Sequence, residues 1–185
     1  MSRIPRLTPH ELDADQQRLY AAITGGDRAR GPQFFELTDS EGRLVGPFNA
    51  MLLNPPIGDA LQRLGAAIRY GGRLPARCRE IAILAVAAHW QCGFELRAHE
   101  SIAAHAGLSA TQIAALGNGE PVDFGDPVEA EVLRTTRHLL EHGSLDDDSY
   151  AAAASAIGPD KLFELTTLVG YYSLLALQMN AFAVR

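Results

Sequence analysis

The sequence predicts an all-α protein, and three observations support that fold class. Signals that start helices recur along the 185 residues, as a capping residue followed by Pro or by Glu or Gln. Between these signals, apolar residues return every three or four positions, as they do on one face of a helix. Only one short segment has the turn residues and apolar runs of strands. These patterns predict seven or eight helices that pack on one another.

The first part of the chain is expected to hold one helix and to allow one small hairpin. A capping box over residues 8–11 predicts a helix that ends at Gly25. Residues 27–32 are polar and read as a linker. Residues 34–46 hold two short apolar runs around a turn with a late glycine, which is consistent with a small hairpin. Two strands alone are marginally stable, so such a hairpin has to pack on helices.

The rest of the chain is expected to be helical. A short helical run follows residue 46, and the start and stop signals then predict helices over residues 54–70, 75–90, 92–106, 109–117, 126–142, 144–157 and 158–185. No tandem repeat is visible. The length suits one domain with a proper core, so residues 1–185 are predicted to form a single domain.

Composition and charge exclude several classes of function. The net charge is −6 and Lys and Arg form no block, which argues against a nucleic-acid surface or a polybasic membrane patch. No signal-peptide pattern opens the chain, so a reducing, cytoplasmic compartment is the default, and Cys78 and Cys92 are not expected to form a structural disulfide. Residues 162–184 are apolar but interrupted by polar side chains, which favours a buried or interface helix over a membrane span.

Glu80, Cys92, Glu95 and His99 stand out as candidate catalytic residues. Each helical residue advances about 100°, so spacings of three and four place Cys92, Glu95 and His99 on the face that should be buried. A carboxylate on a buried face is rare unless it is paired. Glu80 would lie about 18 Å from Cys92 on one unbroken helix. It can reach His99 only if the chain turns between His89 and Cys92, where no Gly or Pro forces a turn.

With such a turn, these groups could act as an activated nucleophile or a proton relay. A helix dipole would lower the pKa of Cys92 at the first turn, His99 could accept a proton, and Glu80 could fix the tautomer of His99. Structural alternatives stay open at this point. Cys92 is then a small buried hydrophobe and His99 a hydrogen-bonded core residue. Glu80 is then an acid paired with Arg77 or Arg79.

The same stretch does not make a metal-binding pattern. The spacing H-x2-C-x2-E-x3-H that begins at His89 is no standard zinc spacing, and it needs an unbroken helix. His138 and His142 lie four residues apart, but among charged residues on a face expected to be solvated. The chain has no HExxH, no Gly-rich phosphate loop and no GxSxG. We therefore predict neither a metal nor another cofactor.

At these residues the sequence resembles the carboxymuconolactone decarboxylase family, which shares its fold with AhpD-like (alkylhydroperoxidase D-like) proteins. Residues 74–84 resemble the family's LPxRxRExxIL opening, residues 94–99 its aromatic-Glu-x-x-x-His, and residues 106–113 its AGLSxxxI. Residues 46–52 look like a longer-chain subgroup. The resemblance implies an AhpD-like helical fold. It divides the chain into a core at 47–117, an N-terminal extension at 1–46 and C-terminal helices at 126–185.

The peroxidase branch of this family uses C-x-x-C-x-x-x-H with a Glu twelve residues before the first Cys. Glu80, Cys92 and His99 match that frame, but Glu95 stands where the branch has its second, attacking cysteine. A carboxylate cannot perform thiol redox chemistry. Cys78 lies at the far end of the preceding helix, and a disulfide needs Cα atoms within about 7 Å. A dithiol peroxidase cycle is therefore not expected.

In the decarboxylase branch, Glu95 and His99 would handle the loss of a carboxylate from a lactone and the reprotonation of the enolate. The resemblance thus favours a cofactor-free acid–base lyase on a small carboxylated or lactone substrate, with Glu80 orienting His99 and Cys92 lining the pocket. Candidate cations for the substrate carboxylate are Arg69, Arg73 and Arg77. 

Two other functions remain open. One is an AhpD-like thiol peroxidase that uses Cys92 with an external thiol. The other is a non-catalytic oligomeric protein in which Glu95 and His99 form a buried structural pair. The resemblance also implies a homo-oligomer, a trimer or a hexamer, with the apolar residues 162–184 as an interface element.

Overall fold

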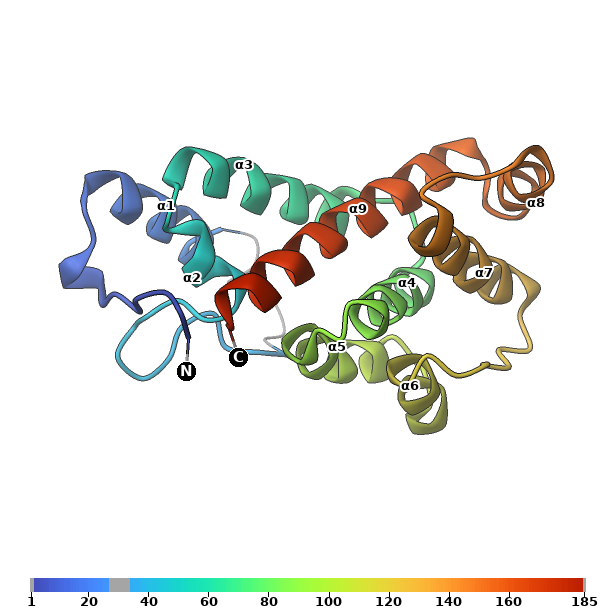
Figure 1. Cartoon of the computed structure of the whole chain (residues 1–185), viewed down its shortest axis with the longest axis horizontal. Helices are drawn as coiled ribbons and strands as arrows, with labels where there is room; N and C mark the ends of the chain where they lie inside the picture. The colour runs from blue at the N-terminus through green and yellow to red at the C-terminus, as the bar shows by residue number, and fades with distance from the viewer. Residues whose placement is uncertain (1, 27–33, 185) are drawn as a thin grey trace. The chain divides into compact units, whose positions relative to one another are not determined.

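The computed structural model describes residues 2–26 and 34–184, and this part of the chain is built from helices (Figure 1). The all-α prediction is confirmed. Residues 1–71 with 177–185 form one compact unit, and residues 72–176 form another. The single-domain organisation stays a prediction. The first unit contains η1 (Pro9–Glu11), α1 (Ala14–Thr24), α2 (Pro47–Met51), α3 (Pro55–Ala66) and the π-helical turn η3 (Ala67–Gly71).

The second unit contains α4 (Ala76–His89), α5 (Gly93–His105), α6 (Ala110–Gly117), α7 (Pro127–His142) and α8 (Asp147–Ile157). It also includes α9 (Pro159–Phe182) as far as Ala176. These bounds agree with the predicted ones to within about three residues. Side-chain caps explain the starts of several helices: Ser109 accepts from the N–H of Gln112, and Asp126 from the N–H of Val128.

The first unit differs from the prediction in two places. The single helix expected from residue 8 is a short 3₁₀ turn followed by α1, because the Asp13 side chain accepts hydrogen bonds from the N–H groups of Asp15 and Gln16 and starts a new helix. The hairpin over 34–46 is reduced to one antiparallel bridge, Thr38 to Leu44, and the described residues contain no strand. The predicted linker at 27–32 lies outside the described residues.

Helix α4 is the centre of the second unit and packs against α5, α6 and α7 (Figure 1). Its residues from Ile81 to Ala87 are all buried. A helix that is apolar on every side is a core helix, which explains why α4 shows little amphipathic pattern. Glu80, which comes directly before this stretch, is buried at its start.

Arg77 fastens the start of α4 to its neighbours. Its Nε and Nη2 donate to the two carboxylate oxygens of Glu129 on α7, at 2.5 and 2.9 Å. Its Nη1 donates to the carbonyl of Gly107, just after α5. Such a two-pronged pair is among the stronger side-chain contacts. The guanidinium of Arg77 is therefore committed to holding the helices together.

The break between α4 and α5 is made by Gln91. The N–H of Gln91 bonds to the carbonyl of Ala88, and the N–H of Cys92 bonds to the carbonyl of Ala87. This is a Schellman motif, in which the residue after the helix cap takes the left-handed conformation. Gln91 does so with φ of 51°. Glycine is the usual residue there, so the sequence carried no clear signal for the turn, although the turn itself is confirmed.

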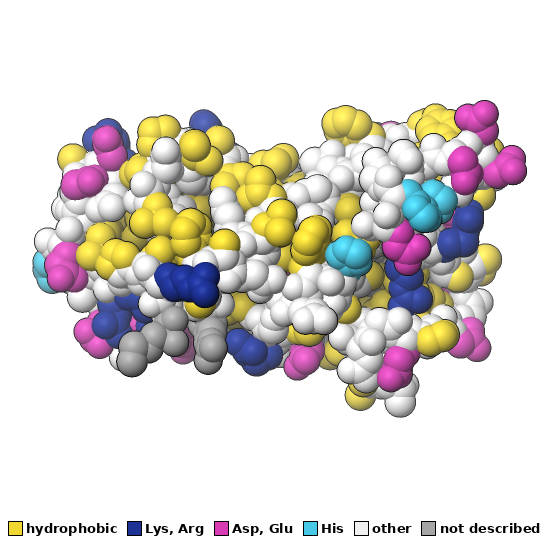
Figure 2. Space-filling model, viewed as in Figure 1, with side chains coloured by type: hydrophobic (Ala, Val, Ile, Leu, Met, Phe, Trp, Pro, Cys, Tyr) yellow, Lys and Arg dark blue, Asp and Glu magenta, His cyan; other side chains and the backbone are white. Residues whose placement is uncertain are grey.

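Helix α9 buries one face and exposes apolar side chains on another. Leu165, Leu168 and Leu175 are buried, whereas Phe163 is 74% exposed. Figure 2 shows apolar side chains reaching the surface on the viewed face. No helix in the described part of the chain is long and apolar enough to cross a membrane. A trimer or hexamer with α9 in its interface stays a prediction.

The substitution Gln91→Gly tests the turn. Glycine adopts a positive φ without the steric cost that other residues meet, so we expect the variant to be more stable by about 1 kcal/mol. Urea unfolding of the two proteins measures this difference. Glu100→Gly on the exposed face of α5 is the matched control, and it should lower stability by about 1 kcal/mol. A loss of stability in both variants would contradict the assigned turn.

Candidate active site

The turn at Gln91 brings Glu80 back beside His99. Glu80 Oε2 on α4 lies 2.7 Å from Nδ1 of His99 on α5, although the two residues are 19 positions apart. Glu80 is 1% exposed and His99 is 5% exposed. The structure therefore brings together two of the four predicted site residues in one buried hydrogen bond.

This hydrogen bond determines what His99 can do. A carboxylate accepts, so Nδ1 carries the proton and donates it, and Nε2 is left with its lone pair as the group that can take up a proton. The ring of Tyr172 on α9 stands edge-on to the imidazole, with ring centres 5.3 Å apart. Glu80 fixes the tautomer, and Tyr172 restricts the plane of the ring. Sequence reasoning missed Tyr172, because nothing in its helical pattern separates it from an ordinary core aromatic.

Glu95 is buried without a partner. It is 3% exposed, and neither of its carboxylate oxygens has a hydrogen-bond partner in the described part of the chain. Burial raises the pKa of Glu95 from 4.5 to about 8. A carboxyl group with that pKa is mostly protonated at neutral pH and can donate a hydrogen bond or a proton. Glu95 and His99 are four residues apart on α5, so both can face one ligand.

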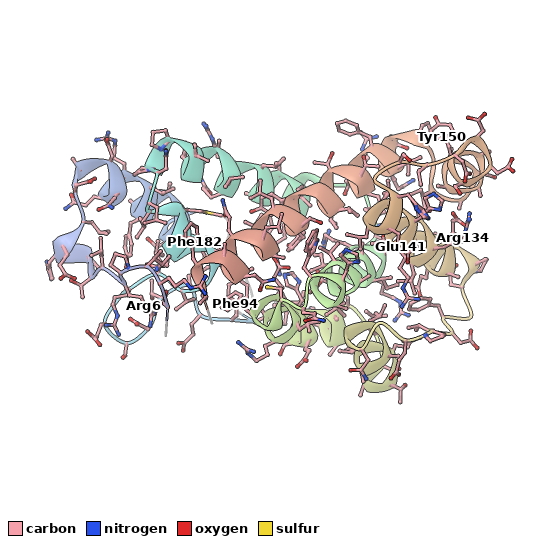
Figure 3. All side chains as sticks on the ribbon, in the orientation of Figure 1. Arg6, Phe94, Arg134, Glu141, Tyr150 and Phe182 are labelled. Atoms are coloured by element: carbon pink, nitrogen blue, oxygen red, sulfur yellow. The ribbon has the colours of Figure 1, made fainter. Side chains whose placement is uncertain are left out.

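Cys92 is the capping residue of α5 and is 1% exposed. Burial raises the pKa of its thiol, and the negative charge of Glu95 adds to the rise. The N–H groups of Glu95 and Phe94 at the helix start favour the thiolate but are outweighed. Figure 3 labels Phe94 in this first turn of α5. The expectation of a lowered thiol pKa at this position was therefore wrong, because desolvation exceeds the effect of the helix end.

Cys78 does not supply a second thiol for Cys92. Both cysteines are free and buried. Cys78 lies in the first turn of α4, whereas Cys92 follows the opposite end of that helix. Burial raises the pKa of the Cys78 thiol to about 11.

Arg79 is a cation beside the Glu80–His99 pair that the sequence analysis considered only as a partner for Glu80. Its Nε lies 3.8 Å from Glu80 Oε1, which is beyond a hydrogen bond. Both of these atoms are buried, and neither has a hydrogen-bond partner in the described residues. The two oxygens of Glu80 thus have different neighbours, His99 on one side and Arg79 on the other.

The three arginines proposed from the sequence lie elsewhere or are engaged. Arg77 is held by Glu129 and by a backbone carbonyl. The side chain of Arg73 is 82% exposed, with only a 3.9 Å contact to a carboxylate. Arg69 belongs to η3 in the other unit.

A second place with charged side chains is an open groove of about 400 Å³ along α7. Figure 3 labels Arg134 and Glu141, which line this groove. Arg134 is paired with Glu131 through two hydrogen bonds, and Arg137 donates to the carbonyl of Glu120. Both arginines thus already have protein partners, and the groove is open, so the buried cluster on α4 and α5 is the better candidate. Among residues 2–26 and 34–184, no group of three or more His, Cys, Asp or Glu side chains could hold a metal ion.

The fold is that of the AhpD-like all-helical proteins. Seven solved chains match the structure. One is a protein of unknown function from Agrobacterium tumefaciens, proposed to be the antioxidant defence protein AhpD. It is 18% identical, with a TM-score of 0.65, and the match covers 74% of this chain and 94% of that one.

Two further matches cover the whole chain at 12% identity and a TM-score of 0.73. One is an uncharacterized peroxidase-related protein from a Silicibacter species, 91% of which is covered. The other is the debrominase Bmp8 as a cysteine-to-alanine variant in complex with 2,3,4-tribromopyrrole, 93% of which is covered. At these identities the likeness shows the fold alone. No curated protein sequence matches this chain.

Residues 55–138 match the model of the carboxymuconolactone decarboxylase family. This match agrees with the sequence resemblance to the same family. The segment includes α4 and α5, and with them Glu80, Arg79 and the whole stretch from Cys92 to His99.

The buried carboxyl of Glu95 predicts how stability depends on pH. The folded protein holds this proton up to about pH 8, whereas the unfolded chain releases it near pH 4.5. The folded state binds more protons between these values, so stability is full below the lower one and falls as pH rises towards the higher one, by up to about 5 kcal/mol. Glu95→Gln should remove this fall. Urea unfolding at about pH 5 and about pH 8 measures it.

Glu100→Gln, on the exposed face of the same helix, is the control and should keep the wild-type pH dependence. If wild type and Glu95→Gln lose the same stability between the two pH values, the buried, protonated state of Glu95 is wrong.

Proposed function

We propose that this protein is a cofactor-free acid–base enzyme, a lyase acting on a small carboxylated or lactone substrate. The observation that carries the proposal is the buried Glu80–His99 hydrogen bond on the same helix pair as a buried carboxyl group, Glu95, that has no hydrogen-bond partner among the residues described. Two ionisable groups with different environments are the usual arrangement for an acid and a base in one site. The match of residues 55–138 to a family named for a decarboxylase supports the proposal.

The residues have separate roles in this reaction. When a carboxylate leaves as carbon dioxide, the electron pair of the broken C–C bond moves into the lactone carbonyl and forms an enolate. Protonated Glu95 donates a proton to that enolate carbon. His99, held by Glu80 in the tautomer with a free Nε2, returns a proton to Glu95 from solvent. Cys92 lines the pocket as a neutral thiol. The apolar surrounding excludes water and strengthens each of these interactions.

Substitutions in the pair should remove activity. His99→Asn and Glu80→Gln are expected to lower kcat for decarboxylation of carboxymuconolactone by about 100-fold or more, because positioned acid–base groups contribute that much. Release of carbon dioxide and uptake of a deuteron from heavy water measure the reaction. In wild type, the rate should fall as pH rises through about 8, where Glu95 loses its proton.

Cys78→Ser is the matched control outside the site and should keep the activity. If no carboxylated lactone is turned over, the lyase proposal is wrong. If, in addition, the variants lose stability without any activity being found, a non-catalytic role for the buried residues is favoured.

The alternative is a thiol peroxidase that uses Cys92 with an external thiol. The peroxidase-related protein among the structural matches motivates it. A peroxidatic thiol reacts as the thiolate, and here burial raises the thiol pKa. Glu95 stands where the peroxidase motif has its second cysteine, and a carboxyl group can transfer a proton but cannot be oxidised as a thiol can. These features favour the lyase.

The thiol can be measured directly in Cys78→Ser, where Cys92 is the single cysteine. We expect its pKa, followed by the ultraviolet absorbance of the thiolate, to lie above the ordinary value of about 8.5. We also expect no consumption of hydroperoxide with an added thiol. A lowered pKa together with turnover would overturn the lyase in favour of the peroxidase.

A further inference from the structure

We propose that Arg79 is the anion-binding group of this site and takes the carboxylate of the substrate. This deepens the proposed function, on which it rests for the position of the reacting groups. A guanidinium has five N–H donors and normally satisfies them when it is buried. The Arg79 side chain is 16% exposed, and its Nε is buried with no hydrogen-bond partner in the described part of the chain. A buried guanidinium N–H without a partner is costly unless a ligand accepts from it.

The neighbouring carboxylate does not fill this role. Glu80 Oε1 lies 3.8 Å from Arg79 Nε, too far for a hydrogen bond, and Glu80 is held in place by the short contact of its other oxygen with His99. Glu80 therefore balances the charge of Arg79 without using its donors. A carboxylate ligand can accept two parallel N–H bonds from the same guanidinium, in the geometry that Arg favours.

The rest of the site agrees with an anion at Arg79. Burial raises the pKa of Glu95 to about 8, so this carboxyl group is neutral below that pH and does not repel a bound anion. Arg79 lies beside Glu80, and Glu80 bonds to His99 on α5.

This arrangement describes the ligand by its chemistry. It is a small molecule with a carboxylate at one end, which binds Arg79, and a carbonyl group a few bonds away, which reaches the acid–base groups on α5. The other candidate arginines cannot take this place, since Arg77 is held by Glu129 and Arg73 extends into solvent.

The test uses unreactive carboxylates, so that binding is separated from catalysis. Calorimetric titration of wild type with acetate, succinate and benzoate gives their dissociation constants. Arg79→Gln should weaken binding by about 10- to 100-fold, the usual effect of losing a charge-assisted hydrogen-bonded pair. Arg79→Lys keeps the positive charge but loses the two parallel N–H donors, so its affinity should lie between those of wild type and Arg79→Gln. Arg73→Gln, which removes an exposed arginine of the same region, should bind as wild type does.

A second measurement needs no variant at Arg79. Benzamide has the shape of benzoate without its charge, and it should bind wild type much more weakly. This comparison decides the question if Arg79→Gln fails to fold, as judged by circular dichroism. Equal binding of benzoate and benzamide, equal binding by wild type and Arg79→Gln, or no binding of any of the three carboxylates to wild type would overturn the assignment.

These outcomes are independent of the proposed reaction. His99→Asn should still bind benzoate, because His99 is not the anion-binding group. If carboxylates bind through Arg79 but no lactone is decarboxylated, the anion site stands and the lyase fails. If decarboxylation depends on His99 while Arg79→Gln binds carboxylates normally, the lyase stands and the role of Arg79 fails.

Discussion

The hydrogen bond between Glu80 and His99 is the constraint on which the site depends. It joins two helices that follow one another in the chain, and it exists only because α4 ends at His89 and α5 runs back beside it. Twelve residues of continuous helix would place Glu80 about 18 Å from Cys92, at the far end of one rod. A single left-handed residue, Gln91, therefore converts a linear motif into a compact cluster.

Burying the ionisable side chains of Glu80 and Glu95 makes the protein less stable than it would be with apolar residues at these positions. Glu80 is buried at the start of the apolar stretch of α4, and both oxygens of Glu95 lack hydrogen-bond partners among the described residues. Such groups raise the free energy of the folded state unless a ligand satisfies them. The Arg77–Glu129 pair and the packing of α4 against three helices offset this cost from outside the site. The second unit thus contains costly buried ionisable groups, and stabilising contacts around them compensate.

The sequence predicted the helices of the second unit because their ends carry local chemistry. Ser109 and Asp126 cap helix starts with their side chains, and Gly107, which lacks a side chain, takes a positive φ after α5. Such signals can be recognised without tertiary contacts. The turn at Gln91 could only be inferred from the family resemblance, since glutamine has no preference for a positive φ. The unpartnered Nε of Arg79 could not be inferred from the sequence, because whether an arginine is satisfied depends on neighbours distant in sequence. The pKa of Cys92 was misjudged for a related reason, because burial is a tertiary property that outweighs the local helix end.

Replacing a thiol by a carboxyl at position 95 changes which chemistry the same frame can support. Glu80 and His99 form a buried hydrogen-bonded pair, which as a proton relay would serve either a thiol or a carboxylic acid. A thiol at position 95 could exchange electrons with Cys92 by forming a disulfide, whereas a carboxyl group can exchange only protons. Its burial moves the pKa of Glu95 into the range where it can donate a proton near neutral pH. Burial thus raises the pKa of both groups, which disfavours the Cys92 thiolate and favours the protonated form of Glu95. The proposed acid–base reaction would use both effects of the same apolar site.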